Sequence, residues 1–165
     1  MIALAPMTES EYRAFATATI RDYAADKAAS GEWPADAAPA LSRQAYDELV
    51  PHGLATPAHF FFTLLDRATA SAVGTLWIAT RPRAGRRIAY VYGVNVDPAH
   101  RRKGYATDAF RALEDWVRAA GLAGIALHVF GHNHGAQALY RRLGFEATDI
   151  TMYKPVDRDS ARQKY

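Results

Sequence analysis

The stretch 101-RRKGYATDAF-110 places three cations and a glycine directly before a segment with helical periodicity. From Pro98 to Ala106 the chain has no Ser, Thr, Asp or Asn that could cap the coming helix. The first N–H groups of a helix have no partner inside it, so several donors are expected to be free beside Gly104. Free N–H groups close to positive charge favour an anion such as a phosphate. Water could satisfy the same groups, and the stretch alone leaves both interpretations open.

Two common phosphate-binding motifs are absent. The chain has no GxxxxGK[ST] sequence and no GxGxxG after a strand, which argues against a P-loop and a dinucleotide fold. What remains is a strand with a small residue at Gly93, the helix start at Gly104, a second short strand, and a helix that carries the phenol of Tyr140. This order suits a long ligand whose phosphates bind the helix start while its arm follows the strand edge.

The elements after this junction follow from apolar periodicity. We expect a helix over 104–120 that ends at Gly121, a short buried strand over 124–130, a helix over 133–143 capped by Asn133, and a last strand over 145–154.

The elements before the junction comprise two helices and three strands. The helices are expected over 8–29, with Thr8 as cap, and over 40–50, and the strands over 59–66, 72–80 and 87–96, with a turn at 81–86. In the third strand one face is expected to hold Ile88, Tyr90, Tyr92, Val94 and Val96. Gly93 within it suggests a bulge or a close approach to the backbone. The order predicts one α/β (α+β) domain over 1–154, followed by a polar tail over 155–165.

Composition narrows the function classes. The chain has 165 residues and no cysteine, which excludes disulfides and thiolate metal sites and favours a reducing, cytoplasmic environment. We expect no membrane association, because no apolar stretch approaches the roughly 18 residues of a membrane span and no signal peptide is evident. A net charge of +3 favours anionic ligands, but the charge is scattered and no nucleic-acid-binding motif accompanies it, which argues against nucleic acid.

Two segments together resemble the GNAT superfamily of N-acetyltransferases. Residues 101-RRKGYA-106 fit its (Q/R)xxGx(G/A) signature, and 133-NHGAQALYRRLGF-145 is similar to its second signature, in the usual order and at the usual distance. The pieces GEWPADA, LVPHGLATPAHFF and VGTLWI resemble a small bacterial subgroup of uncharacterised acetyltransferases, so the resemblance covers residues 1–154. It implies a mixed, mostly antiparallel sheet flanked by helices, with splayed fourth and fifth strands.

The resemblance also implies acetyl-CoA as co-substrate and a primary amine as acceptor. The N–H groups of Arg102 to Ala106 would hold the pyrophosphate, the backbone of Val94 to Val96 would pair with the pantetheine arm, and an N–H near Val94 would polarise the thioester carbonyl. Tyr140 would be the catalytic general acid that protonates the departing thiolate. The residues assigned to the cofactor are Val94, Asn95, Val96, Arg101, Arg102, Lys103, Gly104, Tyr105, Ala106, Asn133 and Ala136.

The chain differs from the family pattern at the position of the general base. Many relatives carry an acidic residue on the fourth strand, whereas this chain has 92-YGVN-95 there, and Asp97 already begins the loop. The amine could lose its proton through water to His128 or Tyr92, or arrive neutral. The missing carboxylate also leaves open an alternative, an acyl-CoA-binding module without catalysis.

The remaining polar and aromatic residues give weaker indications of a functional site. His128, His132 and His134 lack the acid or cysteine spacing of a metal site, so no metal is expected. Glu32 and Trp33 would lie in a loop near the acceptor, and His59 is expected to be a surface residue at a strand end. Exposed strands leave a homodimer open.

Overall fold

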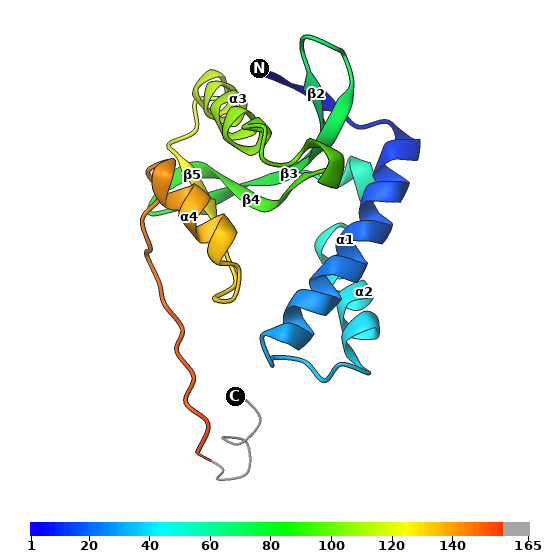
Figure 1. Cartoon of the computed structure of the whole chain (residues 1–165), viewed down its shortest axis with the longest axis vertical. Coiled ribbons are helices and arrows are strands. Elements are labelled where there is room, and N and C mark those ends of the chain that lie inside the picture. Colours follow the sequence, from blue (N-terminus) through cyan, green and yellow to red (C-terminus); the bar gives the residue numbers. More distant parts are fainter. Residues whose placement is uncertain (157–165) are drawn as a thin grey trace.

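The computed structural model describes residues 1–156 and places an open sheet between two layers of helices (Figure 1). Its strands are β1 (Ile2–Pro6), β2 (His59–Asp66), β3 (Ala72–Arg83), β4 (Arg86–Val96) and β5 (Ile125–Leu127). Its α-helices are α1 (Glu9–Ala29), α2 (Ala38–Leu49), α3 (Tyr105–Ala119) and α4 (His134–Arg142). Two short 3₁₀ turns, Gly53–Ala55 and Pro98–His100, lie in the connections. No helix within the described range has the length and apolar character needed to cross a membrane.

The sheet has the order β1-β2-β3-β4-β5. Its first three pairings are antiparallel, and β4 pairs with β5 in parallel. The β4–β5 pairing covers only Ala89–Val91 of β4, so the rest of β4 continues without a neighbour on that side. This confirms the predicted mixed sheet with splayed fourth and fifth strands.

The helices form where the sequence predicts them. The Thr8 side chain accepts from the N–H of Glu11, whose carboxylate accepts from the Thr8 N–H, and this reciprocal cap begins α1. The helix α3 buries Phe110, Leu113 and Val117 against one face of the sheet. The pair α1 and α2 covers the other face through an aromatic cluster. Two cores therefore lie on opposite faces of the sheet.

A bulge in β4 changes which side chains share a face. The pairing with β3 skips Tyr92, because Trp77 lies opposite Gly93 and the next β3 residue lies opposite Val91. Tyr92 packs with Trp77 in the core beside α1 and α2, whereas Val94 packs in the core beside α3. The expected bulge is thus confirmed. The expectation that Val94 shares a face with Tyr92 is wrong, because an extra residue reverses the alternation.

Two strand assignments fail. β1 was not expected, but it pairs with β2 along its whole length, from Ile2 opposite Asp66 to Pro6 opposite Phe62. The strand expected over 145–154 is absent: residues 146–156 are extended and exposed. The turn expected over 81–86 contracts to Ala84 and Gly85, because both flanking strands continue to it. The tail expected over 155–165 lies mostly outside the described residues.

Candidate functional site

The start of α3 presents a row of free backbone donors. Its cap residue is Gly104, with φ 85°, and no side chain bonds to the helix start. The first backbone bond of the helix joins the Asp108 N–H to the Gly104 carbonyl, at 3.1 Å. Within residues 1–156, no acceptor bonds to the N–H groups of residues 102–107. The predicted absence of a cap is therefore real, and the helix dipole adds positive potential at the same place.

The turn that presents these donors depends on left-handed backbone. Both Arg102, with φ 64°, and Gly104 adopt it. A side chain at Gly104 would meet no protein atom within 4 Å, so this glycine faces open space. The requirement for glycine is conformational here, and the space beside it is available to a ligand.

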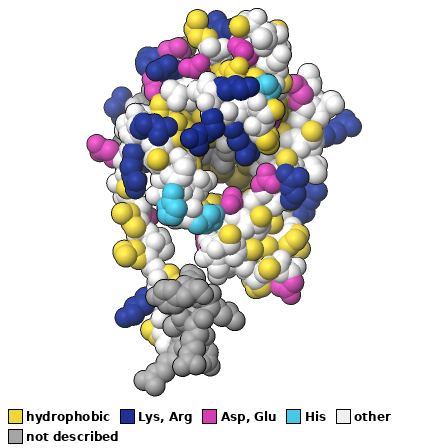
Figure 2. Space-filling model, in the orientation of Figure 1, with side chains coloured by type: hydrophobic (Ala, Val, Ile, Leu, Met, Phe, Trp, Pro, Cys, Tyr) yellow, Lys and Arg dark blue, Asp and Glu magenta, His cyan; other side chains and the backbone are white. Residues whose placement is uncertain are grey.

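Two of the three cations fold back onto the turn. The Arg101 Nε donates to the Val96 carbonyl at 2.9 Å, and the Lys103 Nζ donates to the Ala99 carbonyl at 3.1 Å. Both hydrogen bonds stabilise the turn. The positive charges of both side chains remain near its backbone N–H groups. Figure 2 shows a hollow in this face of the molecule, with Lys and Arg side chains along its upper rim and His and acidic side chains along its lower rim.

The open edge of β4 begins where β5 ends its pairing. Beyond Val91 only β3 borders β4 among the described residues, which leaves the other edge of Val94 and Asn95 accessible. A side chain at Gly93 would meet no atom within 4 Å. The Val96 carbonyl differs, since it already accepts from Arg101. The bulge, the open edge and the turn at Gly104 follow one another along the chain.

Tyr140 combines a packed ring with an unpaired hydroxyl. Its ring contacts Phe110 and Phe145, with centroids 5.6 Å and 5.7 Å away. Among the residues that the structure describes, none forms a hydrogen bond with the hydroxyl. A phenol is protonated at neutral pH even at its ordinary pKa, and burial raises the pKa of Tyr140 further. Such a group is suited to donate a proton.

Asn133 and Ala136 form the N-terminal cap of α4. The Asn133 Oδ1 accepts from the Ala136 N–H at 3.1 Å, which is the helix cap predicted from the sequence. A ligand could still reach the Asn133 amide nitrogen. The Ala136 N–H is already bonded, so a ligand contact there would involve its side chain. Tyr105 is similarly engaged, because its hydroxyl donates to Asp66 at 2.8 Å.

His59 is partly buried in an aromatic cluster, whereas the sequence predicts a surface residue. Its Nδ1 accepts from the indole Nε1–H of Trp77 at 3.0 Å, and its ring stacks on Tyr92 at 5.5 Å. Burial, aided by the charge of Arg81, lowers the pKa of His59. The indole bond fixes the proton of the neutral imidazole on Nε2, so this ring acts as a donor in that tautomer. The register pairs His59 with Ala79 and Trp77 with Phe61, so Trp77 is a diagonal neighbour of His59 that the sequence alone does not reveal.

The end of α1 contacts the loop between β5 and α4. The Lys27 ammonium lies 5.5–5.9 Å from the ring centroids of Tyr23, Trp33 and Phe130 and pairs with Glu32. The hydrogen bond from Lys27 lowers the pKa of Glu32, so this carboxylate is already engaged. These contacts join the end of α1 to the loop between β5 and α4.

The three histidines of the H-x3-H-x-H pattern do not form a cluster. His132 lies 3.3 Å from an Asp26 carboxylate oxygen, and His128 packs edge-on against Phe130. Within residues 1–156, no three His, Asp or Glu side chains gather where a metal ion could bind. The geometry therefore gives no support to the metal-site alternative.

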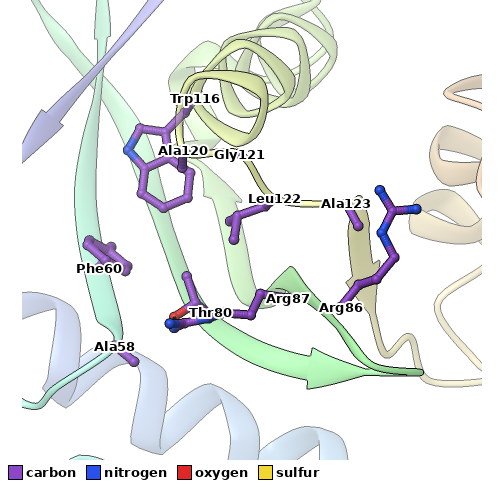
Figure 3. Close-up of a pocket in the computed structure, with 10 residues that line it drawn as sticks. All are labelled: Ala58, Phe60, Thr80, Arg86, Arg87, Trp116, Ala120, Gly121, Leu122 and Ala123. Carbon is purple, nitrogen blue, oxygen red and sulfur yellow. The ribbon is translucent and has the colours of Figure 1, made fainter.

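A pocket of about 630 Å³ lies at the far end of β4 from the Gly104 turn. Figure 3 shows Phe60 and Trp116 beside it, with Arg87 directed toward Thr80. Residues 120–123, which follow α3, line one side of the pocket. Its distance along β4 from Val94 separates it from the donors described above.

The family follows from sequence comparison with this geometry. A model of the acetyltransferase (GNAT) family matches residues 18–145. The chain belongs to the GNAT family of acetyltransferases. It is similar to YycN of Bacillus subtilis, an uncharacterized N-acetyltransferase, with 38% identity over 153 residues that cover 93% of this chain and 97% of YycN. It is also similar to the uncharacterized N-acetyltransferase YdgE of the same organism, with 33% identity over 92% of this chain and 96% of YdgE.

The fold agrees with a solved structure of this GNAT subgroup. The crystal structure of Bacillus subtilis YycN superimposes with a TM-score of 0.90 at 37% identity, over 96% of this chain and 100% of that chain. The predicted fold and family are confirmed. The chain is an acyltransferase of a family that transfers acyl groups to amines.

Proposed function

We propose that this GNAT protein transfers an acetyl group from acetyl-CoA directly to a primary amine. The observation that carries the proposal is the continuous path from the open edge of β4 to the uncapped start of α3. One end of this path suits the amides of a pantetheine arm, and the other suits a pyrophosphate. The amine could belong to a small metabolite, an antibiotic, a peptide or a protein.

Each part of the path has a proposed role. The N–H groups of residues 102–106 bind the pyrophosphate, supported by the charge of Arg101 and Lys103. The backbone of Val94 and Asn95 pairs with the arm, and Asn133 contacts it from α4. An N–H near Val94, turned by the bulge, polarises the thioester carbonyl.

The chemistry is a single displacement. The amine lone pair attacks the thioester carbon, the C–S bond breaks, and the Tyr140 hydroxyl gives its proton to the departing thiolate. No covalent enzyme intermediate is required. Support for this role comes from the unpaired hydroxyl of Tyr140, since a phenol is protonated at neutral pH.

The proton of the amine needs an acceptor, and β4 carries no Asp or Glu side chain. Burial raises the pKa of Tyr92, and a neutral phenol of raised pKa is a weak proton acceptor. Glu32 is paired with Lys27. We therefore propose that the amine binds in its neutral form or releases its proton to water at the cleft, with His128 as a second acceptor.

Thermal unfolding with and without acetyl-CoA tests the binding half of this proposal. A ligand at 100 times its dissociation constant stabilises a protein by about 2.7 kcal/mol. For a chain of this size the melting temperature should rise by roughly 5–10 °C. No rise with acetyl-CoA, CoA or longer acyl-CoAs would contradict the proposal.

Release of CoA thiol in the presence of an amine panel tests the transfer half. The protein has no cysteine, so a thiol reagent detects CoA without background from the enzyme. The panel should include polyamines, aminoglycosides, amino acids and peptides with a free N-terminus or lysine. Binding of acetyl-CoA with no amine-dependent release would favour the alternative, a module that binds acyl-CoA without catalysis.

A further inference from the structure

The guanidinium of Arg81 is held on an aromatic ring and has no acidic partner. It lies 4.6 Å from the ring centroid of Tyr90, in a cation–π contact. The side chain is exposed, and within residues 1–156 no carboxylate forms an ion pair with it. A guanidinium stacked on a ring keeps the N–H donors at its edge free, and two of them can bind one carboxylate.

Arg81 and Tyr90 lie on the face of the sheet that α1 and α2 partly cover. Trp77 and Tyr92 pack in the core beside these helices. Side chains alternate along a strand, so Arg81 shares the face of Trp77 on β3 and Tyr90 shares the face of Tyr92 on β4. The ring centroids of Tyr90 and Tyr92 are 4.9 Å apart. The two rings therefore connect Arg81 to the bulge, next to the proposed position of the thioester carbonyl.

The charge of Arg81 acts on the groups around it. Burial lowers the pKa of His59, and the charge of Arg81 lowers it further. Burial raises the pKa of Tyr92, and the same charge opposes that rise. The floor of this face therefore has a positive potential, which attracts an acidic group of a ligand.

The acidic side chains at the end of α1 are already in contact with bases. Glu32 pairs with Lys27, and a carboxylate oxygen of Asp26 lies 3.3 Å from the Nε2 of His132. Neither β3 nor β4 carries an Asp or Glu residue. This distribution of charge favours an acceptor amine that also carries an acid, and it disfavours a polyamine.

The distance from Tyr90 to the open edge of β4 sets the length of such an acceptor. Tyr90 and Val94 are four positions apart, which is about 13 Å in a regular strand, and the bulge shortens this to about 10 Å. An α-amino acid carries its amine and its carboxylate on the same carbon and does not span this distance. An extended tripeptide does, because each residue adds about 3.3–3.6 Å.

We propose that Arg81 binds the carboxylate of a short peptide or similar elongated amino acid, whose amine lies about 10 Å from that carboxylate. The inference rests on the proposed acetyl transfer and names the acceptor class for it. The amine lies at the bulge near Val94, the chain of the acceptor crosses the rings of Tyr92 and Tyr90, and the carboxylate meets the guanidinium. Arg81 is thus a specificity-determining residue.

Two acceptors that differ only in the acid test this role. Triglycine and triglycine amide have the same amine and the same length, but only triglycine carries a carboxylate. The KM of the wild type should be about tenfold lower for triglycine, the size expected for a hydrogen-bonded charge pair. In Arg81→Met the two KM values should become equal, through a higher KM for triglycine. Arg83→Met removes the same charge from an exposed position on the same strand and should keep the preference.

Binding of the same peptides to the protein saturated with CoA separates this inference from the proposed function. An NMR titration measures these affinities without turnover, and melting temperatures verify that both variants are folded. If neither peptide is acetylated but triglycine binds more tightly than its amide, and only while Arg81 is present, the acid site is supported and the transfer reaction is not. Acetylation of other amines without a preference for triglycine supports the transfer and overturns the acid site. A preference that persists in Arg81→Met, or no binding of either peptide, also overturns it.

Discussion

The two edges of β4 have opposite characters. Toward β3 the strand is paired from Arg86 to Val96, and Gly74 of β3 lies so close that a Cβ there would be 2.0 Å from the Asn95 carbonyl oxygen. Toward β5 it is paired over only three residues, Ala89 to Val91, and no strand within the described range borders the rest of β4 on that side. One edge therefore contributes to the stability of the fold, and the other is accessible to a ligand.

Two glycines, Gly74 and Gly104, are required for different physical reasons. Gly74 is needed because the protein leaves no room for a side chain. Gly104 is needed because its backbone is left-handed, in a place where the protein leaves ample room. A glycine in the sequence does not distinguish these cases, but substitution does.

The largest effect is expected at the closed edge. Gly74→Ala forces backbone of β3 and β4 apart and should lower the free energy of unfolding by about 3 kcal/mol, at the upper end of overpacking costs. Urea denaturation measures the change. Gly93→Ala is the control, because a Cβ there would meet no protein atom within 4 Å, and its expected change is within about 0.5 kcal/mol. Equal stability of the two variants would mean that the edges do not differ as described.

Substitution of Tyr140 is expected to reduce turnover without reducing the stability of the fold. Tyr140→Phe retains the ring contacts with Phe110 and Phe145 but removes the proposed proton donor. Turnover should fall about 100-fold, while the affinity for acetyl-CoA should change by less than about two-fold. Steady-state kinetics and calorimetry measure the two quantities. Tyr153→Phe, at an exposed tyrosine, should retain full activity, and undiminished turnover in Tyr140→Phe would remove this residue from the mechanism.

The turn at Gly104 should respond in both ligand binding and stability. Gly104→Val introduces a branched side chain at φ 85° and should weaken acetyl-CoA binding by about tenfold or more, together with a strain cost of about 1–2 kcal/mol. Gly85→Val is a matched control, because Gly85 has φ 74° and open space around it but lies in a hairpin remote from the turn. If both variants bind acetyl-CoA like the wild type, the pyrophosphate lies elsewhere.

The smallest effect concerns His59, beside the bulge where the closed and open parts of β4 meet. Its pKa is lowered in the folded state, so the unfolded chain binds more protons as the pH falls below about 6.5. Stability contributed by the neutral ring is present above that pH and is lost as the pH falls through the folded pKa. The melting temperature should therefore decrease between pH 7 and pH 5.

The variant His59→Asn isolates this contribution. Its amide oxygen can still accept from Trp77, but it does not titrate, so the melting temperature should depend less on pH over the same range. A slope identical to that of the wild type would assign the pH dependence to other groups.

The features that the sequence predicts are those encoded locally. The Thr8 cap, the limits of α3 and the uncapped turn at Gly104 depend on residues a few positions apart, and the structure has them as expected. The two family signatures are equally local. The second signature also predicts that Asn133 caps α4 and that Tyr140 lies on this helix.

The features that sequence reasoning misses depend on distant partners. β1 forms because β2 is available to pair with it, and residues 145–154 are unpaired despite a strand-like sequence. The role of His59 depends on Trp77, which the strand register brings beside it. The same limit applies to Val94, whose face is set by a bulge that only the pairing with β3 reveals.

The free donors of residues 102–107 have a consequence for how this protein is handled. Donors that suit a pyrophosphate also suit inorganic phosphate and sulfate, which are common in purification and assay buffers. Such ions would compete with acetyl-CoA and raise its apparent KM without altering any residue. Kinetic constants measured in phosphate buffer should therefore differ from those measured in a chloride salt of the same ionic strength, and the choice of buffer becomes part of the enzymology.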